Sequence, residues 1–239
     1  MGILKKIKNK YLKLNSSRIH LETFLKNASE EMAPGALMLD AGSGDGRYKK
    51  FFPKVTYESA DICKLERDYG NVSYVCDLKS IPVEDSRFDA IICTQVLEHV
   101  NEPIEVLKEF HRVLKKDGVL YLTAPLYYPE HEIPYDFFRY TQYGHQHMFS
   151  KCGFTIEKIE WMEGYYMTLS TQLWIAAESL SLNYKHYRIG LLALLVLPLV
   201  LMCKICFPLL AYMFAKLDTN HKYTAKGHCK NYQVKAVRT

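Results

Sequence analysis

Short apolar runs alternate with segments of helical periodicity from residue 36 to residue 162. The runs have the length of β-strands and lie at residues 36–40, 55–61, 72–75, 89–93, 119–124 and 154–162. Between them, apolar residues three and four positions apart predict a helix at 103–114, begun by Pro103 and stopped by Gly118. Helices are also expected at 47–52 and 141–151. Alternating strands and helices predict an α/β fold, a Rossmann-like, doubly wound and mostly parallel sheet.

The end of the chain has the pattern of one more strand, which would make seven. Residues 229–238 alternate, with Tyr232, Val234 and Ala236 expected to face inward and Lys230 and Lys235 outward. We expect this last strand to join the same sheet.

A hydrophobic insertion precedes that strand. Residues 189–215 contain one charge, Lys204, and two prolines, Pro198 and Pro208, that are expected to interrupt a straight helix. The uncharged part, residues 189–203, would be about 22 Å long as a helix, shorter than the roughly 30 Å hydrocarbon core of a bilayer. If the last strand returns to the sheet, the run must begin and end on one side of a membrane. A proline-broken hairpin, re-entrant or lying in one leaflet, fits this condition, and a buried helical cap or a dimer face is the alternative.

The predicted domain organisation follows from these patterns. Residues 1–30 form a basic amphipathic helical segment, residues 31–163 and 226–239 form the catalytic domain, and residues 164–225 form a helical insert that associates with a membrane at 189–215.

Basic residues gather at both ends of the chain. Residues 1–20 hold six Lys or Arg and no acid, and residues 216–239 hold six against Asp218 alone, which leaves 19 basic and 25 acidic residues between them. Apolar residues interleaved with the N-terminal lysines favour anionic lipid headgroups as the partner, and no nucleic acid is expected. The alternatives are a helix packed on the sheet and a nucleic-acid grip with steeply salt-dependent RNA binding.

The seven cysteines are scattered, and two of them, Cys93 and Cys229, lie in expected strands, as reduced thiols do. Cys203 and Cys206 form a C-x-x-C pair, but no second pair completes a zinc site, so no metal centre is expected. Together with the apolar insert, the cysteines predict a protein at the cytoplasmic face of a membrane. The oligomeric state is left open.

Candidate chemistry begins at residues 37–48, which read as a strand, a tight glycine turn and a helix start. Asp40 ends the strand, and Gly42, Gly44 and Gly46 follow at alternate positions, where missing side chains let a ligand lie against the main chain. The spacing differs from that of a dinucleotide site, and an acid before the turn suits a cationic ligand. Asp61 lies 21 residues beyond Asp40 at the tip of the next strand, where a carboxylate can hold ribose hydroxyls. Glu58 is the alternative if the strand register differs.

These motifs resemble those of the class I S-adenosylmethionine-dependent methyltransferases, over about residues 30–162 and the last ten. The resemblance implies S-adenosylmethionine as cofactor, with Asp40, Gly42 and Gly44 around its amino-acid and ribose portion and Asp61 on the ribose hydroxyls. It also implies that Asp77 accepts from the adenine amino group, that Leu78 covers the ring and that Gln95 lies beside the ligand. The family signature is matched by residues 97–100, Leu-Glu-His-Val, whose Glu-His pair anchors a helix start near the cofactor.

The acceptor side is expected in residues 125–149, which combine prolines, aromatics and polar groups. The pattern His-x-x-Pro-x-Asp-Phe-x-Arg-Tyr-Thr from His131 resembles a branch of methyltransferases associated with surface-polysaccharide and glycolipid assembly. His131 is the first candidate for the base that oxygen methylation needs, Asp136 the second, and His145 or His147 the third. Arg139 can pair with an acceptor carboxylate or phosphate. Alternatively, Asp136 and Arg139 pair with each other in an aromatic lid.

The expected function is therefore O-methylation of a lipid-linked glycan or another membrane-proximal amphipathic acceptor. The alternatives are a small lipid or quinone precursor as acceptor, and a membrane-tethered binding protein that keeps the fold without turnover.

Overall fold

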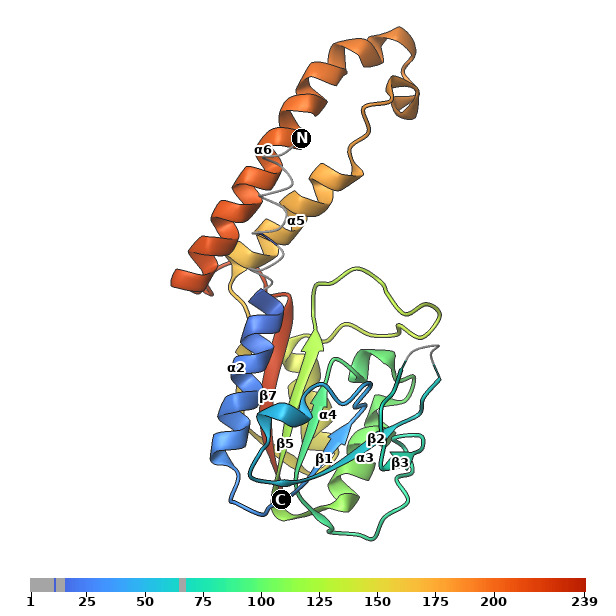
Figure 1. The fold of residues 1–239 in the computed structure, drawn as a ribbon, viewed down its shortest axis with the longest axis vertical. Coiled ribbons are helices and arrows are strands. Elements are labelled where there is room, and N and C mark those ends of the chain that lie inside the picture. The colour runs from blue at the N-terminus through green and yellow to red at the C-terminus, as the bar shows by residue number, and fades with distance from the viewer. Residues whose placement is uncertain (1–10, 12–15, 65–67) are drawn as a thin grey trace. The chain divides into compact units, whose positions relative to one another are not determined.

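The computed structural model describes residue 11 and residues 16–64 and 68–239 (Figure 1). Of the predicted basic N-terminal segment, residues 1–30, residues 1–10 and 12–15 lie outside the described residues. Its last part is helix α2, Ser16–Glu31. The chain divides into two compact units, one of residues 20–162 and 231–239 and the other of residues 1–19 and 163–230.

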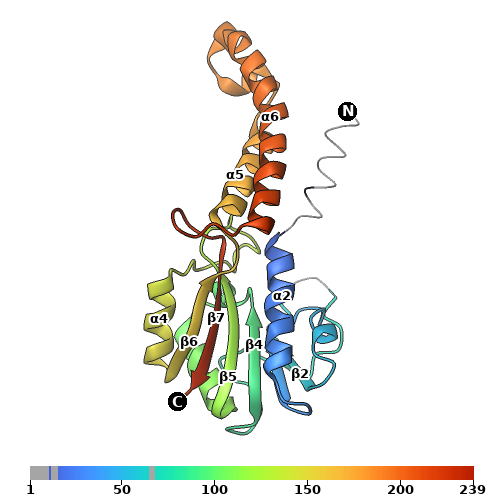
Figure 2. The same ribbon diagram turned by 90° about the vertical axis from the view of Figure 1, so that its left-hand side faces the viewer.

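The larger unit is built on one seven-stranded sheet in the order β3-β2-β1-β4-β5-β7-β6. Strands β1 to β5 pair in parallel, and β7 lies antiparallel between β5 and β6 (Figure 2). The predicted fold class is therefore confirmed. The strands are β1 (Leu37–Ala41), β2 (Thr56–Asp61), β3 (Tyr74–Val75), β4 (Phe88–Thr94), β5 (Leu114–Pro125), β6 (Phe154–Trp161) and β7 (Asn231–Arg238).

Helices cover both faces of this sheet because its central strands are apolar on both sides. In β4, Ile91 packs in the cluster that contains α3 (Pro103–Val113) and α4 (Gln142–Lys151), whereas the next residue, Ile92, packs in the cluster that contains α2. Neighbouring residues of a strand point to opposite faces, so a buried parallel strand reads as a continuous apolar run. Helix α4 begins where Thr141 Oγ1 accepts a hydrogen bond from Gly144 N at 3.0 Å.

Two expected elements differ in the structure. Residues 47–52 form no α-helix but a 3₁₀ turn, Lys49–Phe51, before Pro53. Gly118 does not stop α3, because the helix ends at Val113 and β5 begins at the next residue. Gly118 instead lies inside that strand, where a Cβ atom would stand 2.8 Å from the carbonyl oxygen of Lys115. Glycine is needed there for close backbone packing.

The smaller unit contains a helical hairpin of α5 (Tyr165–Ser179) and α6 (Ala193–Asn220). The Ser170 hydroxyl donates to the Ala211 carbonyl at 2.6 Å, and the Tyr166 and Phe214 rings lie tilted against each other with centroids 5.8 Å apart. The expected break at the prolines was wrong, since α6 runs through Pro198 and Pro208 for 28 residues. The hairpin forms between the two helices rather than within residues 189–215.

Lys230 was also expected to point outward, but its side chain is buried and its Nζ donates to Ser17 Oγ at 2.9 Å. Burial lowers the pKa of this amine. The expectation failed because strand alternation applies only from Asn231, where β7 begins.

Candidate cofactor and acceptor site

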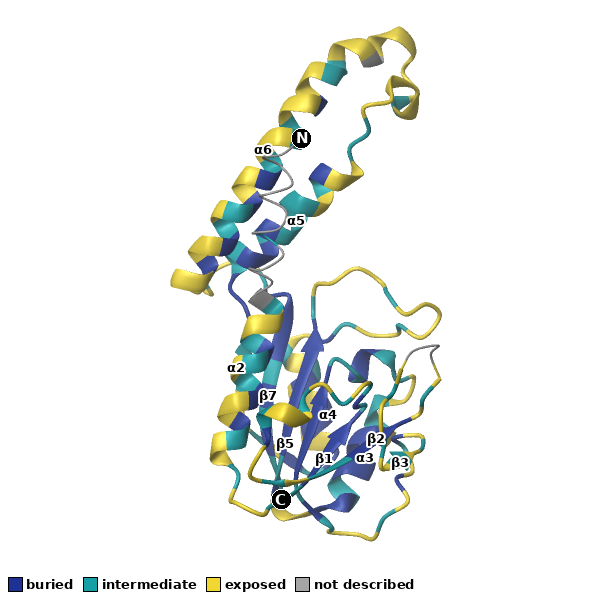
Figure 3. Cartoon of the chain, viewed as in Figure 1, coloured by how far each residue is buried: buried dark blue, intermediate teal, exposed yellow. Residues whose placement is uncertain are grey.

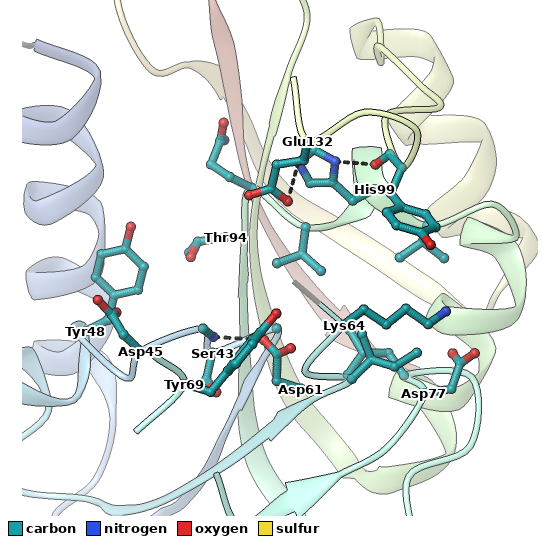
Figure 4. A pocket seen from close by; sticks show the side chains of 18 of the residues that line it. Ser43, Asp45, Tyr48, Asp61, Lys64, Tyr69, Asp77, Thr94, His99 and Glu132 are labelled. Carbon is teal, nitrogen blue, oxygen red and sulfur yellow. Dashed lines mark hydrogen bonds and ion pairs between the residues drawn. The ribbon is translucent and has the colours of Figure 1, made fainter. Parts of the chain in front are cut away.

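A cavity of about 560 Å³ opens at the carboxyl ends of β1, β2 and β4. This is the edge at which open parallel sheets bind ligands. Figure 4 shows Asp61 and Asp77 toward one end of the cavity and His99 and Glu132 at the other. Six of the residues predicted to bind a cofactor line the cavity: Gly42, Gly44, Asp61, Asp77, Leu78 and Gln95.

The glycine turn presents its backbone to this cavity. Gly42 and Gly44 have φ angles of +80° and +55°, which residues with side chains rarely adopt. The Gly42 amide donates to the Ala60 carbonyl at 2.7 Å, which holds the turn against the end of β2. A Cβ atom on Gly42 would collide with the Val96 side chain, which also lines the cavity. The turn therefore depends on glycine at position 42 for both conformation and space.

Asp61 fixes the turn to the second strand. Its Oδ2 accepts from the Gly44 amide and its Oδ1 from the Cys63 amide, each at 2.9 Å. A carboxylate has about four lone-pair directions, so Asp61 can still accept from a ligand hydroxyl. Glu58 does not line the cavity, because Arg87 donates to its Oε1 at 2.7 Å and the Tyr74 hydroxyl to its Oε2 at 2.7 Å. The strand register thus selects Asp61 rather than Glu58.

Asp40 lies elsewhere than predicted. Its side chain is fully buried, it does not line the cavity, and the Tyr57 hydroxyl donates to its Oδ2. Burial raises the pKa of Asp40 to about 7, and the nearby Asp61 charge acts in the same direction. Asp40 can therefore act on a bound ligand through its charge, without lining the ligand's cavity.

Residues that follow β3 and β4 complete the lining of the cavity. Asp77 is exposed, and its Oδ1 accepts from the Lys79 amide at 3.0 Å, while the neighbouring Leu78 is buried. Gln95 has a φ of +56°, and its Nε2 donates to Thr123 Oγ1 at 3.1 Å. A carboxylate, an apolar side chain and an amide thus contribute to the lining of the cavity, and these are the groups that a nucleoside base and its polar edge require.

The predicted acceptor residues His131, Asp136 and Arg139 lie outside the set that lines the cavity. Arg139 donates from its two terminal nitrogens to both Asp136 oxygens at 2.6 and 2.7 Å, and these bonds hold the pKa of Asp136 well below its ordinary range. Asp136 and Arg139 therefore pair with each other within the loop, which was the alternative expectation for the aromatic segment. Asp136 is a poor base in this state, because its proton affinity is low.

The later histidines are also placed away from the cavity. His145 is fully buried, and burial lowers its pKa to about 4, whereas His147 is exposed on the same helix. Neither side chain lines the cavity.

Two cavity residues were missed as functional candidates in this region, Glu132 and Tyr135, and for His99 an anchoring role was preferred to that of a general base. His99 lines the cavity, with its Nδ1 2.6 Å from the Tyr135 carbonyl oxygen and its Nε2 3.8 Å from Glu132 Oε2. The adjacent Glu98 is buried, and burial raises its pKa to about 8. The Leu-Glu-His-Val motif was the available signal, but its partners follow more than 30 residues later.

The site thus combines an exposed glycine turn, two carboxylates and an apolar patch with a histidine and a glutamate at its far end. The first group can hold a nucleoside that carries positive charge. The second can contact a hydroxyl-bearing molecule placed beside it.

Comparison with known proteins agrees with this geometry. Residues 39–122 match the methyltransferase-domain family. Over 98 residues the chain is 36% identical to the human protein named "Probable tRNA methyltransferase 9B", covering 38% of this chain and 22% of that protein. It is 28% identical over 110 residues to a ubiquinone biosynthesis O-methyltransferase of Xanthomonas campestris pv. campestris (strain B100), covering 41% and 46%. The chain therefore spans less than half the length of these curated relatives.

The fold is similar to that of geranyl diphosphate C-methyltransferase from Streptomyces coelicolor A3(2), solved with Mg²⁺, geranyl diphosphate and S-adenosyl-L-homocysteine. The TM-score is 0.57 at 14% identity, over 92% of this chain and 78% of that one. At this identity the likeness concerns the fold.

Proposed function

We infer that this chain, a class I S-adenosylmethionine-dependent methyltransferase, transfers a methyl group to a hydroxyl of a lipid-linked glycan or another amphipathic molecule at a membrane. The observation that carries the inference is the cavity, in which the glycine turn and two acids adjoin a histidine-containing end. The acceptor class rests on a second feature, the exposed apolar helix of the insert.

The residues present fit the cofactor. Gly42 and Gly44 leave room for its amino-acid portion against the main chain, and Asp61 can accept from its ribose hydroxyls. Asp77 can accept from the adenine amino group, with Leu78 against the ring. Asp40 and Asp61 place negative charge near a ligand that is positive at sulfur and at its amino group. When bound, the cofactor supplies a methyl group already activated by the sulfonium, so the protein contributes mainly orientation.

The acceptor hydroxyl would enter at the end lined by His99, Glu132 and Tyr135. A hydroxyl there must lose its proton as the methyl group is transferred. His131 was the first candidate for this base, and its ring contacts that of His99 with centroids 4.7 Å apart. We assign the acceptance of this proton to the pair His99 and His131. Asp136 is a poorer base, because its proton affinity is low.

Membrane association is proposed from the helical hairpin. Residues 190–220 are long and apolar enough to cross a membrane by length and composition, and most of their side chains are exposed (Figure 3). The insert leaves the sheet at Met162 and returns at Asn231, and the Met162 amide donates to the Asn231 carbonyl at 2.8 Å. Because its two ends adjoin, the insert would enter and leave a bilayer on the same side, here taken as the cytoplasmic face. Anionic lipids are the proposed partners of the basic chain ends.

The acceptor is tested by incubating the full chain and S-adenosylmethionine, labelled in its methyl group, with membrane extracts of its source cells. We expect label in the organic-solvent extract, in molecules from which mild acid releases a labelled glycan. Label that stays with the lipid would favour a small lipid or quinone precursor, and label in RNA would refute the membrane acceptor. No label in any fraction from a protein that binds S-adenosylhomocysteine would indicate a binding protein without turnover.

Two variants control this experiment. Asp61→Asn weakens the hydrogen bonds to the Gly44 amide and to the ribose hydroxyls, so this variant should incorporate much less label. Glu58→Gln changes an acid of the same strand that does not line the cavity, so incorporation should persist.

A further inference from the structure

Glu98, His99 and His131 bring three metal-ligating side chains together at the end of the cavity. One candidate ligand atom from each lies within 4.8 Å of the other two. The first two residues follow β4, and the third comes from the loop after β5. The three residues do not form a local sequence motif. They meet because the loop after β5 brings His131 back to the Leu-Glu-His-Val segment.

Glu98 is the unexplained member of this cluster. Its side chain is fully buried, and neither carboxylate oxygen has a hydrogen-bond partner among the described residues. An unpaired buried carboxylate costs several kcal/mol or more, so without a cation the group takes up a proton, whereas a bound cation favours its charged form. The guanidinium of Arg139 is the nearby positive charge, but its terminal nitrogens already donate to Asp136. No Lys or Arg among the described residues is ion-paired with Glu98, whose Oε1 lies 3.9 Å from His99 Nε2.

Both histidines are oriented as metal ligands are. The Nδ1 of His99 lies 2.6 Å from the Tyr135 carbonyl oxygen, which can only accept, so Nδ1 carries the proton and Nε2 keeps its lone pair. That Nε2 lies 3.9 Å from Glu98 Oε1 and 3.8 Å from Glu132 Oε2. Outer hydrogen bonds from a histidine to a carbonyl or carboxylate are the usual support of a metal ligand.

His131 follows the same logic. Its Nδ1 lies 3.2 Å from the Pro129 carbonyl oxygen and 3.3 Å from Asp136 Oδ2, both acceptors, which leaves the lone pair on Nε2. Asp136, fixed by Arg139, thus positions His131 from behind. The Asp136–Arg139 pair, which does not line the cavity, can therefore still act on the cluster by positioning His131.

We propose that Glu98, His99 and His131 bind one divalent cation, with Glu132 as a fourth ligand. Two imidazoles with carboxylates suit Mn²⁺, Fe²⁺ or Zn²⁺. Ligand atoms around such an ion are about 3.4 Å apart when the bonds are ~2.1 Å, so the side chains close by one to two Å on binding. Because His99 and Glu132 also line the cavity, the ion would meet the acceptor hydroxyl and lower its pKa, and the proton would then pass to solvent rather than to a ligating histidine. Cation binding stands by itself, whereas this role in transfer rests on the proposed function.

Mn²⁺ is the probe, because it binds thiolates weakly and so avoids the Cys203–Cys206 pair. The full chain is treated with a chelator and titrated with MnCl₂ while the electron paramagnetic resonance signal of the free ion is followed. We expect one ion per chain, with affinity reduced at least about tenfold in both Glu98→Gln and His131→Gln. His147→Gln, an exposed histidine of α4, should bind Mn²⁺ as the unchanged protein does.

S-adenosylhomocysteine binding by each variant checks that the domain is folded. If Glu98→Gln does not fold, the partly exposed His131 keeps the test open. Absence of Mn²⁺ binding, or binding that neither folded variant weakens, would overturn the site. Mn²⁺ binding without methyl transfer would leave the site standing and count against the proposed function alone.

Discussion

Asp40 is the residue at which stability and ligand binding oppose each other. The fold buries its carboxylate completely, with the Tyr57 hydroxyl as its hydrogen-bond donor, and this raises its pKa from 3.8 to about 7. A positive ligand in the adjacent cavity would favour the ionised form. The ionised form of Asp40 therefore destabilises the ligand-free protein but favours binding of a positively charged ligand.

Replacement of Asp40 by Asn should stabilise the ligand-free protein at alkaline pH. The folded pKa lies above the unfolded one, so between about pH 4 and 7 the folded state holds a proton that the unfolded state releases, and stability falls as pH rises through this window. At ~1.4 kcal/mol per pH unit the loss is about 4 kcal/mol, which Asp40→Asn should largely remove at pH 8 while changing little at pH 4. Urea denaturation of both proteins at several pH values measures this.

Asp68→Asn, at an exposed acid near the same site, is the control and should keep the wild-type slope. An equal fall in stability with pH in Asp40→Asn would mean that another group causes it.

The positions of residues at strand tips could be predicted from the sequence, because the order of strands along the chain determines them. Parallel strands bring Asp61 and Asp77 to one edge wherever the helices between them lie, and the glycines mark the turn. The burial of Asp40 depends on side-chain packing, which the pattern does not report. The meeting of Glu98 with His131 depends on the path of a long loop, so no local spacing predicted it.

At the scale of the element, α6 is an apolar helix only partly covered by its partner. Its C-terminal half packs on α5, whereas Lys204 Nζ donates to the Ala177 and Leu180 carbonyls at 2.9 and 2.6 Å, at the end of α5. This cation satisfies terminal carbonyls and opposes the negative end of the helix dipole. Beyond it, the N-terminal part of α6 has no α5 residues to pack on, and its leucines are exposed.

Charges placed on this exposed part should abolish binding to lipid. Leu195 and Leu199 are 77% and 55% exposed, and each lysine at the centre of a bilayer costs about 2.5–3.5 kcal/mol on insertion scales. We expect Leu195→Lys combined with Leu199→Lys to stop the full chain from floating with vesicles of phosphatidylcholine and phosphatidylglycerol. S-adenosylhomocysteine binding should remain.

Leu217→Lys places the same charge at the other end of the helix, where Leu217 is 42% exposed, and should leave flotation unchanged. If the double variant floats like the unchanged protein, the hairpin is a cap or a dimer face.

The sequence predicted a helical insert here but not its form. Two prolines suggested a break, because proline lacks an amide donor and its ring clashes with the preceding turn, yet the helix continues through both. The limits of the insert could be predicted, because the strands on either side, β6 and β7, have clear patterns. The pairing of α5 with α6 could not be predicted, because α5 has no marked apolar stripe.

For the whole molecule, the seven-stranded sheet is completed by β7, a strand that follows the insert in sequence. Strand β7 pairs with β5 over Val119–Pro125, so the sheet needs residues from both sides of the hairpin. The fold class was predictable because alternating strands and helices leave few topologies. The acceptor was not predictable, because the names of the curated relatives refer to different molecules, tRNA and ubiquinone, and their matches cover only 38% and 41% of this chain.

Calorimetric titration of the full chain with S-adenosylhomocysteine tests the central claim most directly. We predict saturable binding of one molecule per chain that Gly42→Ala weakens at least about tenfold, or ~1.4 kcal/mol, because the new Cβ meets Val96. Gly35→Ala has a matching φ of +81° but open space around it and lies away from the cavity, so its affinity should be unchanged. No binding by the folded protein, or equal binding by Gly42→Ala, would contradict the account.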